Sequence, residues 1–442
     1  MKNGRVMKKK IVVISMDALV FEDIKYLSDK PSFSHLLKNG SMVERLRSIY
    51  PTMTYPCHTT MSTGAYPDKH GIVNNTFDIP VKNPPWIFEH SNVKCEDILD
   101  AAKHAGYTTA AVGWPITGLH KNVDYLINEC WPVPDGPIED YEKAYIESGT
   151  PQYLFDEVVA PYLPLRVGRK QPESSLFLAY ITADILRKYN PDILLLHFGV
   201  LDAYRHKTGV FSEKVTEGLD VCEEILTLLF NAAREAGTFD DINWIVTADH
   251  GQLNFAKKIH LNALFHKHNL IDVDENGNVV AWRAFAFASG MSAQVHVKNV
   301  ADREKIYEIL KEAKDSGLWG ISEIYDKARA SAEHLSGEFE FVVEGDGATA
   351  FGNEVISPYA IPANAVLTGL CQGSHGYHPD KAPRPTFIAS GPNIKRGVVL
   401  KDGNLVDGAP TYAEILGISL PDADGTPFYE IIGEDNNGKS NR

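Results

Sequence analysis

Cysteine is scarce in this sequence and follows no pattern. The 442 residues contain five cysteines, an odd number, spread along the chain without a Cys-x-x-Cys pair. This usage does not form a disulfide framework, and it favours a reducing compartment. We therefore expect a cytoplasmic protein.

Long hydrophobic runs are also missing. No segment approaches the roughly 20 consecutive apolar residues that a membrane-spanning helix needs. The first residues, MKNGRVMKKKIVVISMDAL, superficially resemble a signal peptide, but the apolar run Ile11–Met16 is shorter than the usual hydrophobic region of such a peptide. We expect no membrane partner.

Positive charge is in deficit. The chain has 43 Lys and Arg residues against 58 Asp and Glu residues, a formal net charge of -15. Binding to a nucleic-acid polymer rests on cationic side chains that neutralise phosphates, so this balance argues against such a partner. An acidic protein can still bind an anionic substrate if metal ions make the site locally positive.

What the sequence does contain is an alternation of short apolar runs and longer helix-like segments. With 44% hydrophobic residues, a chain of this length can bury a large core. The clearest strands are expected at 10–16, 108–112, 192–198, 243–248 and 385–390, with helices at 94–105 and 213–236. The alternation predicts an α/β fold with a doubly wound, mostly parallel sheet and helices on both faces.

The alternation of apolar runs and helix-like segments changes after about residue 255. Strand-like runs at 293–297 and 339–345 and a helix-like run at 303–315 indicate a small α+β unit, after which the strand at 385–390 returns to the core. We predict a catalytic core at 8–255 and 366–432, an inserted α+β cap at 256–365, and a disordered tail at 433–442. Irregular helices and loops are expected over about 115–175.

Acidic residues and histidines follow three of the predicted strands. They are Asp17 after the first, Asp202 and His206 after the third, and Asp249 and His250 after the fourth. Ligands of open α/β sheets bind beyond the carboxyl ends of the strands, so these residues should meet in space. His375, flanked by glycines in GSHGYHP, completes the set. Clustered carboxylates repel one another, and Asp with His suits Zn²⁺ or a similar divalent cation.

In order, the segments MDAL, PTMTYPCHTTMSTGAYPDKHGIVNN, DAYRH, TADHG and GSHGYHP resemble the alkaline phosphatase superfamily. Within it, they are most similar to the nucleotide pyrophosphatase/phosphodiesterase type. The resemblance covers nearly the whole core and leaves the insertion unmatched. It implies a two-metal hydrolase that cleaves phosphodiester or phosphoanhydride bonds of a small phosphorylated substrate, such as a nucleotide.

Position by position, the resemblance implies two metal sites. Asp202, His206 and His375 would bind one ion, and Asp17, Asp249 and His250 the other, with Zn²⁺ expected and Mn²⁺ as the alternative. Thr54 would be the nucleophile and contact the second ion. Asn75 falls where the family places an amide donor to the phosphoryl oxygens.

The chemistry explains why a threonine can serve here. Its hydroxyl is a weak nucleophile at neutral pH, and coordination to a divalent cation lowers its pKa. Attack on phosphorus would then give a phospho-threonine intermediate. His58 and His70, in the same segment, are interpreted as structural residues.

Four positions near the implied site set this chain apart or bear on its substrate. Met53 stands where many members have Lys, and Cys57 stands where Asn is frequent. Arg205 replaces a usual Gly and could contact a phosphate or carboxylate of the substrate. Tyr55 matches an aromatic position that stacks on a nucleobase in the family, although an ordinary packed Tyr is the alternative.

Other functions remain open. A sulfatase is rejected, because Cys57 lacks the Pro and Arg that such enzymes need at fixed spacing. A phosphonoacetate hydrolase, with Arg205, Lys257 or Lys258 binding the carboxylate, and a phosphomonoesterase are enzymatic alternatives. A non-catalytic binding protein that retains the fold is the alternative of another class. Substrate specificity is expected to reside in the inserted cap, and the oligomeric state is left open.

Overall fold

The computed structural model describes residues 8–77, 80, 85–129, 138–166, 168–363, 372–381 and 383–433. The predicted disordered tail, 433–442, lies outside the described residues apart from Gly433.

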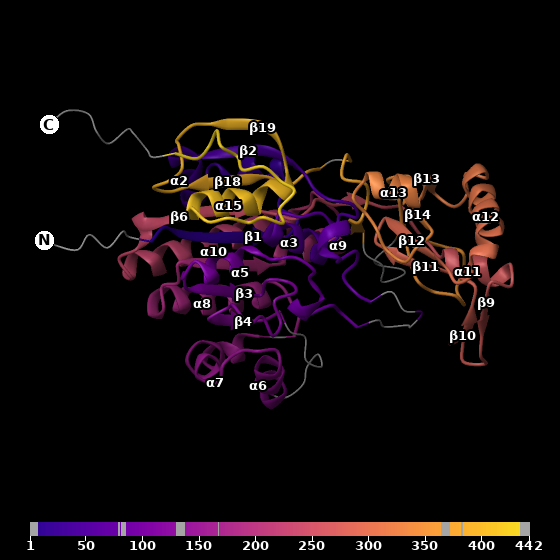
Figure 1. Cartoon of the computed structure of the whole chain (residues 1–442), viewed down its shortest axis with the longest axis horizontal. Coiled ribbons are helices and arrows are strands. Elements are labelled where there is room, and N and C mark those ends of the chain that lie inside the picture. Colours follow the sequence, from indigo (N-terminus) through magenta and orange to yellow (C-terminus); the bar gives the residue numbers. More distant parts are fainter. Residues whose placement is uncertain are drawn as a thin grey trace, which may run out of the picture.

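An eight-stranded sheet forms the centre of the molecule (Figure 1). Its order is β19 (Val399–Asn404), β2 (Gly40–Arg47), β18 (Phe387–Ser390), β6 (Ile242–Thr247), β1 (Lys10–Met16), β5 (Ile193–Phe198), β3 (Thr109–Val112) and β4 (Tyr125–Ile127). Neighbouring strands run parallel except at β18, which is antiparallel to both β2 and β6. The predicted mostly parallel α/β fold is confirmed.

Helices cover both faces of this sheet because its inner strands are apolar on both sides. In β1, Val12 and Ile14 belong to one buried cluster, and Ile11 and Val13 to the other. The first cluster contains α8 (Glu173–Lys188), α10 (Glu213–Glu235) and α2 (Pro31–Asn39). The second contains α5 (Ile98–His104), α15 (Gly408–Leu416) and part of α3 (Thr54–Thr63). Alternation of side chains along a strand thus supplies two cores.

A second unit leaves the core after β6 and lies beyond one end of the sheet, on the right of Figure 1. Its antiparallel sheet has the order β11 (Ala284–Ser289), β12 (Ser292–Val297), β14 (Phe341–Gly345) and β13 (Ile321–Asp326). Around it lie β8 (Lys257–Ile259), α11 (Leu261–Lys267), β9 (Ile271–Val273), β10 (Val279–Trp282), α12 (Arg303–Asp315), α13 (Lys327–Ala332), β15 (Thr349–Phe351) and β16 (Ala360–Pro362). These elements share a buried cluster of their own. This unit contains both helices and strands, and the division into a core at 8–255 and 366–432 with an inserted cap at 256–365 stays a prediction.

The chain enters and leaves this unit at one place. β8 pairs with β16 in antiparallel register, and the Ala363 N–H donates to the Ala256 carbonyl at 2.9 Å.

A third region packs near β4, at the lower edge of the sheet in Figure 1. It contains α6 (Ile138–Glu147), α7 (Gln152–Leu154), a π-helical turn at Phe155–Val159 and a 3₁₀ segment at Ala160–Leu165. Short, irregular helices were expected over 115–175.

Candidate active site

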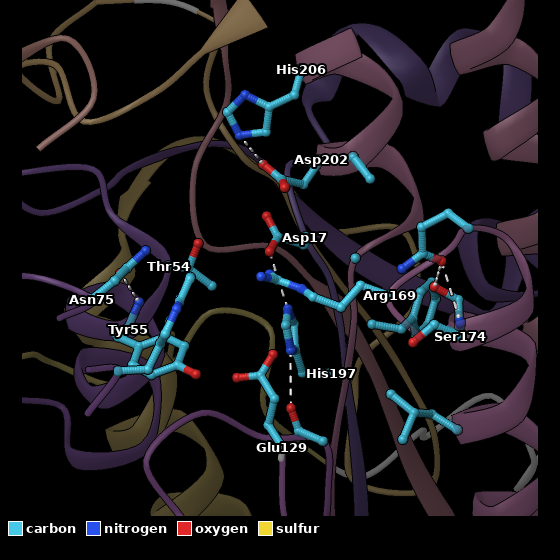
Figure 2. A pocket seen from close by; sticks show the side chains of 18 of the residues that line it. Asp17, Thr54, Tyr55, Asn75, Glu129, Arg169, Ser174, His197, Asp202 and His206 are labelled. Carbon is cyan, nitrogen blue, oxygen red and sulfur yellow. Dashed lines mark hydrogen bonds and ion pairs between the residues drawn. The ribbon is translucent and has the colours of Figure 1, made fainter. Parts of the chain in front are cut away.

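A cavity of about 510 Å³ opens at the carboxyl ends of β1 and β5 (Figure 2). Its lining includes Asp17, directly after β1, and Thr54, the first residue of α3. Asp202 and His206 reach it from α9 (Val200–Thr208), which follows β5. Parallel strands therefore bring residues from distant parts of the sequence to one edge of the sheet.

Asp17, Asp249 and His250 form the first candidate metal group, called here the Asp17 group, in which all three side chains are buried. His250 Nε2 lies 3.1 Å from Asp249 Oδ2 and 3.7 Å from Asp17 Oδ1. The backbone turns sharply after Asp17, because Ala18 has a φ of 63°, and its N–H donates to Asp249 Oδ1 at 3.2 Å. A non-glycine residue in this conformation is uncommon and typical of functional sites.

The carboxylates of the Asp17 group are electrostatically unbalanced. Burial and the nearby Asp249 and Asp202 charges raise the pKa of Asp17, and burial also raises the pKa of Asp249 to about 7. Among the described residues, no donor makes a hydrogen bond to Asp17 Oδ1 or Asp249 Oδ2. Buried oxygens without donors are costly, and a bound cation would satisfy them. This donor set fits a divalent metal ion.

Asp202, His206 and His375 form the second candidate metal group, the Asp202 group. Asp202 Oδ1 lies 3.2 Å from His206 Nε2 and 3.8 Å from His375 Nε2. Although burial opposes the shift, the two histidines hold the pKa of Asp202 well below its usual value. Gln252 also donates to Asp202 Oδ1 at 2.6 Å.

Backbone carbonyls orient both histidines of the Asp202 group. His206 Nδ1 donates to the Gly373 carbonyl at 2.7 Å, and His375 Nδ1 donates to the Thr52 carbonyl at 2.8 Å. With the proton held on Nδ1, each Nε2 keeps its lone pair, the arrangement typical of metal-binding histidines. Gly376, with a φ of 87°, is needed here, since a Cβ would lie 1.7 Å from the Ser289 carbonyl oxygen.

Thr54 lies beside the Asp17 group at the start of a helix. Its Oγ1 is 3.3 Å from His250 Nε2. Asn75 Oδ1 accepts the Tyr55 N–H of the same helix end at 2.9 Å, so the Asn75 amide NH₂ remains as a donor in the cavity. The positive end of the α3 dipole favours negative charge at Thr54.

His58, interpreted as structural, is fully buried behind Thr54. Its Nδ1 donates to the Thr54 carbonyl and its Nε2 bonds to Ser15 Oγ, both at 2.8 Å. It therefore fixes the backbone of the helix start and does not line the cavity.

His197 and Glu129 line the cavity and were missed in the sequence. His197 Nε2 lies 3.1 Å from Asp17 Oδ2, while Nδ1 bonds to the Gly113 carbonyl at 3.0 Å. The one feature of the sequence that could have indicated His197 is its position as a polar residue within the apolar strand DILLLHF. Burial raises the pKa of Glu129 to about 7, against the opposing influence of the Tyr55 hydroxyl and the Arg169 charge.

Tyr55 lines the cavity but is only 1% exposed. Its ring packs against Trp86, with centroids 5.1 Å apart, and against Phe88 at 6.4 Å. Trp86, which is only partly buried, is thus the more accessible aromatic surface of this wall.

Arg205 does not have the substrate-binding position expected for it. Its side chain is fully buried, forms an ion pair with Asp23 and donates to the Val210 carbonyl. Successive residues of a helix are rotated by about 100°, so a residue next to His206, which lines the cavity, points away from it.

The insertion also differs from its expected role. Among the described residues, none from β8 to β16 lines the cavity. Lys257 donates instead to the Leu318 carbonyl within the insertion. Residues outside the insertion line the cavity instead, among them Trp86, Tyr145 and Gln171.

No described helix combines the length and the apolar composition that a membrane span requires.

Comparison with known proteins agrees with this architecture. The sequence matches the family described as type I phosphodiesterase / nucleotide pyrophosphatase over residues 11–377. It is 22% identical to human ectonucleotide pyrophosphatase/phosphodiesterase family member 5, over 96% of this chain and 77% of that protein. It is 23% identical to the human bis(5'-adenosyl)-triphosphatase of this family, over 94% and 80% of the two chains.

The fold is shared with solved structures. Murine ectonucleotide pyrophosphatase/phosphodiesterase 5 superposes with a TM-score of 0.67 at 18% identity, over 96% of this chain and all of that one. An inactive threonine-to-alanine variant of the murine protein, in complex with AMP, gives the same TM-score.

The fold and the site thus define an α/β hydrolase of the alkaline phosphatase type. The chain belongs to the type I phosphodiesterase / nucleotide pyrophosphatase family.

Proposed function

We propose that this protein hydrolyses phosphodiester or phosphoanhydride bonds of a small nucleotide-like substrate through a phospho-threonine at Thr54. The observation that carries the proposal is the position of Thr54, at a helix N-terminus and 3.3 Å from His250, beside two carboxylate–histidine groups. The murine relative whose threonine-to-alanine variant is described as inactive supports a threonine nucleophile.

Two residues of this chain have separate roles in the proposed reaction. Thr54 Oγ1 attacks phosphorus, and its bond to phosphorus forms as the bond to the leaving oxygen breaks. The Asn75 amide donates to the phosphoryl oxygens, whose negative charge grows in the transition state. Water then cleaves the phospho-threonine, which releases the phosphorylated product and restores the hydroxyl.

Two divalent cations complete the proposed site, with Zn²⁺ as the first candidate and Mn²⁺ as the second. The Asp17 group would hold one and the Asp202 group the other. Such ions would supply Lewis-acid stabilisation of negative charge on the nucleophile, the phosphoryl group and the leaving oxygen.

A hydrolysis panel with zinc-loaded protein tests the substrate class. Aryl phosphodiesters, aryl monoesters, dinucleotides and phosphonoacetate are compared by kcat/KM. We expect a nitrophenyl nucleotide diester to exceed nitrophenyl phosphate. A monoester preference of about tenfold, equal to roughly 1.4 kcal/mol, would instead assign a phosphomonoesterase, and turnover of phosphonoacetate alone a phosphonate hydrolase.

The cytoplasmic location expected from cysteine usage is likewise proposed here. Cys57, Cys95 and Cys222 are free thiols in the structure. Fractionation of the source cells would test it, and recovery outside the cytoplasm would reject it.

A further inference from the structure

One histidine at the cavity lies outside both candidate metal groups. His197, near the end of β5, is only 5% exposed and lines the cavity. It is a member of neither the Asp17 group nor the Asp202 group. A buried polar side chain in an apolar strand is costly unless it is hydrogen-bonded, so the contacts of His197 show what it holds in place.

Strand pairing brings His197 beside Asp17. In the parallel register of β1 and β5, His197 pairs with Ser15. Side chains alternate between the two faces of a sheet, so Asp17, two residues after Ser15, starts on the same face as His197. Figure 2 shows the contact that results, in which His197 Nε2 lies 3.1 Å from Asp17 Oδ2.

The two carboxylate oxygens of Asp17 have different surroundings. Oδ2 faces His197, whereas Oδ1 accepts no hydrogen bond among the described residues and lies 3.7 Å from His250 Nε2. The terminal torsion of an Asp side chain is soft. A hydrogen-bond partner on Oδ2 therefore fixes the direction in which Oδ1 points.

The His197 ring is itself held on two sides. Its Nδ1 lies 3.0 Å from the carbonyl oxygen of Gly113, the residue directly after β3. The ring also packs edge-on against His58, with centroids 4.3 Å apart, and His58 packs in turn against Trp114 at 5.0 Å. These contacts fix the ring, so Nε2 has one direction.

The ring of His197 faces two hydrogen-bond acceptors, the Gly113 carbonyl and the Asp17 carboxylate. Because a carboxylate forms hydrogen bonds about twice as strong as a neutral acceptor does, a ring with one proton donates it from Nε2. A ring with two protons donates to both acceptors. The histidines of the Asp202 group differ, since they approach an oxygen that already accepts the Gln252 amide. For Asp17 Oδ2, His197 is the one donor among the described residues.

We propose that His197 is a positioning residue, whose Nε2–H holds Asp17 Oδ2 so that Asp17 Oδ1 is directed at the cation of the Asp17 group. This inference rests on the metal sites of the proposed function. It places His197 on the nucleophile's side of the cavity, since Thr54 lies beside the same group.

Two amide substitutions separate the two nitrogens of the ring. The amide nitrogen of Asn is bonded to Cγ, as Nδ1 of His is, and that of Gln lies one atom further, as Nε2 does. His197→Gln therefore keeps a donor toward Asp17 and loses the one toward Gly113, and His197→Asn does the reverse. His197→Leu removes both donors. The control His35→Asn changes a histidine of α2 that does not line the cavity.

The measured quantity is the affinity for Zn²⁺, by competition with a chelator. All variants are made in a His206→Ala background, which should keep only the ion of the Asp17 group. Loss of a hydrogen bond that orients a metal ligand typically weakens metal binding by about 10- to 100-fold, the rise in the dissociation constant that we expect for His197→Asn and His197→Leu. His197→Gln and His35→Asn should stay within about threefold of the parent protein. Circular dichroism checks that each variant is folded.

Nitrogen NMR of the imidazole rings tests the proton position in the unaltered side chain. In the zinc-loaded wild type we expect a proton on His197 Nε2, and the His197→Gln variant, in which this signal is missing, assigns it. This measurement does not depend on the folding of any substituted site, because the histidine itself is observed.

Three results would overturn the inference: parental Zn²⁺ affinity in His197→Asn, an affinity in His197→Gln as low as in His197→Leu, or a His197 Nε2 without a proton. The last result would make His197 a metal ligand. Protein that binds no Zn²⁺ rejects the metal sites and this inference with them. Protein that binds Zn²⁺ but hydrolyses no diester rejects only the proposed reaction, and the Zn²⁺ affinities still decide the role of His197.

Discussion

The cavity and a second place in the molecule contain nearly the same side chains with different hydrogen bonding. Outside the cavity, His90, Asp97, Asp100 and His120 bring their ligand atoms within 4.8 Å of one another, as the two groups in the cavity do. This Asp97 group lies at the N-terminus of α5. Composition alone does not separate it from the groups at the active site.

The hydrogen bonds do separate them. Asp97 Oδ1 accepts the N–H groups of Leu99 and Asp100, both at 2.9 Å, and Asp97 Oδ2 lies 3.2 Å from His120 Nε2. His120 Nδ1 accepts the Asn122 N–H at 3.1 Å, which places the ring proton on Nε2, the atom that would have to bind a metal. Asp97 is thus a helix cap with an imidazole partner.

In the cavity, the ring protons of His206 and His375 lie on Nδ1 and not on Nε2. Carbonyls take the Nδ1 protons of His206 and His375, and one oxygen of each carboxylate, Asp17 Oδ1 and Asp249 Oδ2, accepts no hydrogen bond among the described residues. A candidate metal site is therefore recognised by lone pairs left without a proton donor, and not by a count of acids and histidines.

The largest effect is expected at Thr54. Thr54→Ala should lower turnover by about 10³-fold or more, since it removes the attacking oxygen, while metal content and folding persist. Thr54→Ser should retain part of the activity because the hydroxyl remains. Single-turnover assays measure both, and an Ala variant with wild-type turnover would assign the nucleophile to another residue.

Metal content should separate the groups directly. Protein purified without chelator should contain about two divalent ions per chain, and His206→Ala should lose about one of them. The matched change His120→Ala should leave the stoichiometry unchanged. Elemental analysis of the purified variants decides this, and loss of an ion in His120→Ala would contradict the distinction drawn from proton positions. Full activity of a metal-free wild type would exclude the two-metal site itself.

Changes in the Asp97 group should affect stability and not activity. Asp97→Asn should lower the free energy of unfolding by about 1–3 kcal/mol, because it weakens charge-assisted hydrogen bonds to a buried cap. Denaturant unfolding at neutral pH measures the loss. Activity at saturating metal should persist, and a stable but inactive variant would place the Asp97 group in the catalytic machinery.

The smallest effect is a pH dependence of opposite sign for two carboxyl groups. The imidazoles hold the pKa of Asp97 below its usual value against the effect of burial, so its stabilisation is present above about pH 4 and is lost as pH falls. Burial raises the pKa of Glu129 to about 7, so its ionisation costs stability as pH rises from about 4.5 to 7. Glu129→Gln should match the wild type in stability at pH 4 and exceed it at pH 8. Thermal unfolding across this range measures it, and parallel curves would contradict the shift.

The core strands and the meeting of the candidate metal-binding residues could be predicted because their signals are local. β1, β5 and β6 are short apolar runs, and a parallel sheet brings their carboxyl ends to one edge. β2 escaped prediction because its run GSMVERLR carries charges at partly buried positions on both faces and lies near the edge of the sheet.

The walls of the cavity could not be predicted, since they depend on packing between distant segments. Arg169 and Glu129 belong to stretches without periodicity, and only the folded chain brings them beside Trp86 and Tyr55. Arg205 was placed wrongly because adjacency in sequence to His206 was taken for adjacency in space. On a helix, residues three or four apart share a face, as Asp202 and His206 do.

The single point at which the chain enters and leaves the insertion brings two positions that are far apart in the sequence together. Because Ala256 and Ala363 are hydrogen-bonded neighbours, an insert of another length would meet the same pair of ends. The entropic cost of closing a loop grows only slowly with its length, so larger or smaller inserts could be grafted there at little cost in loop closure. Such inserts would also have to replace contacts to the site, since the Met291 N–H donates to the His375 carbonyl at 2.8 Å and Ser292 Oγ donates to the Gly376 carbonyl at 2.5 Å.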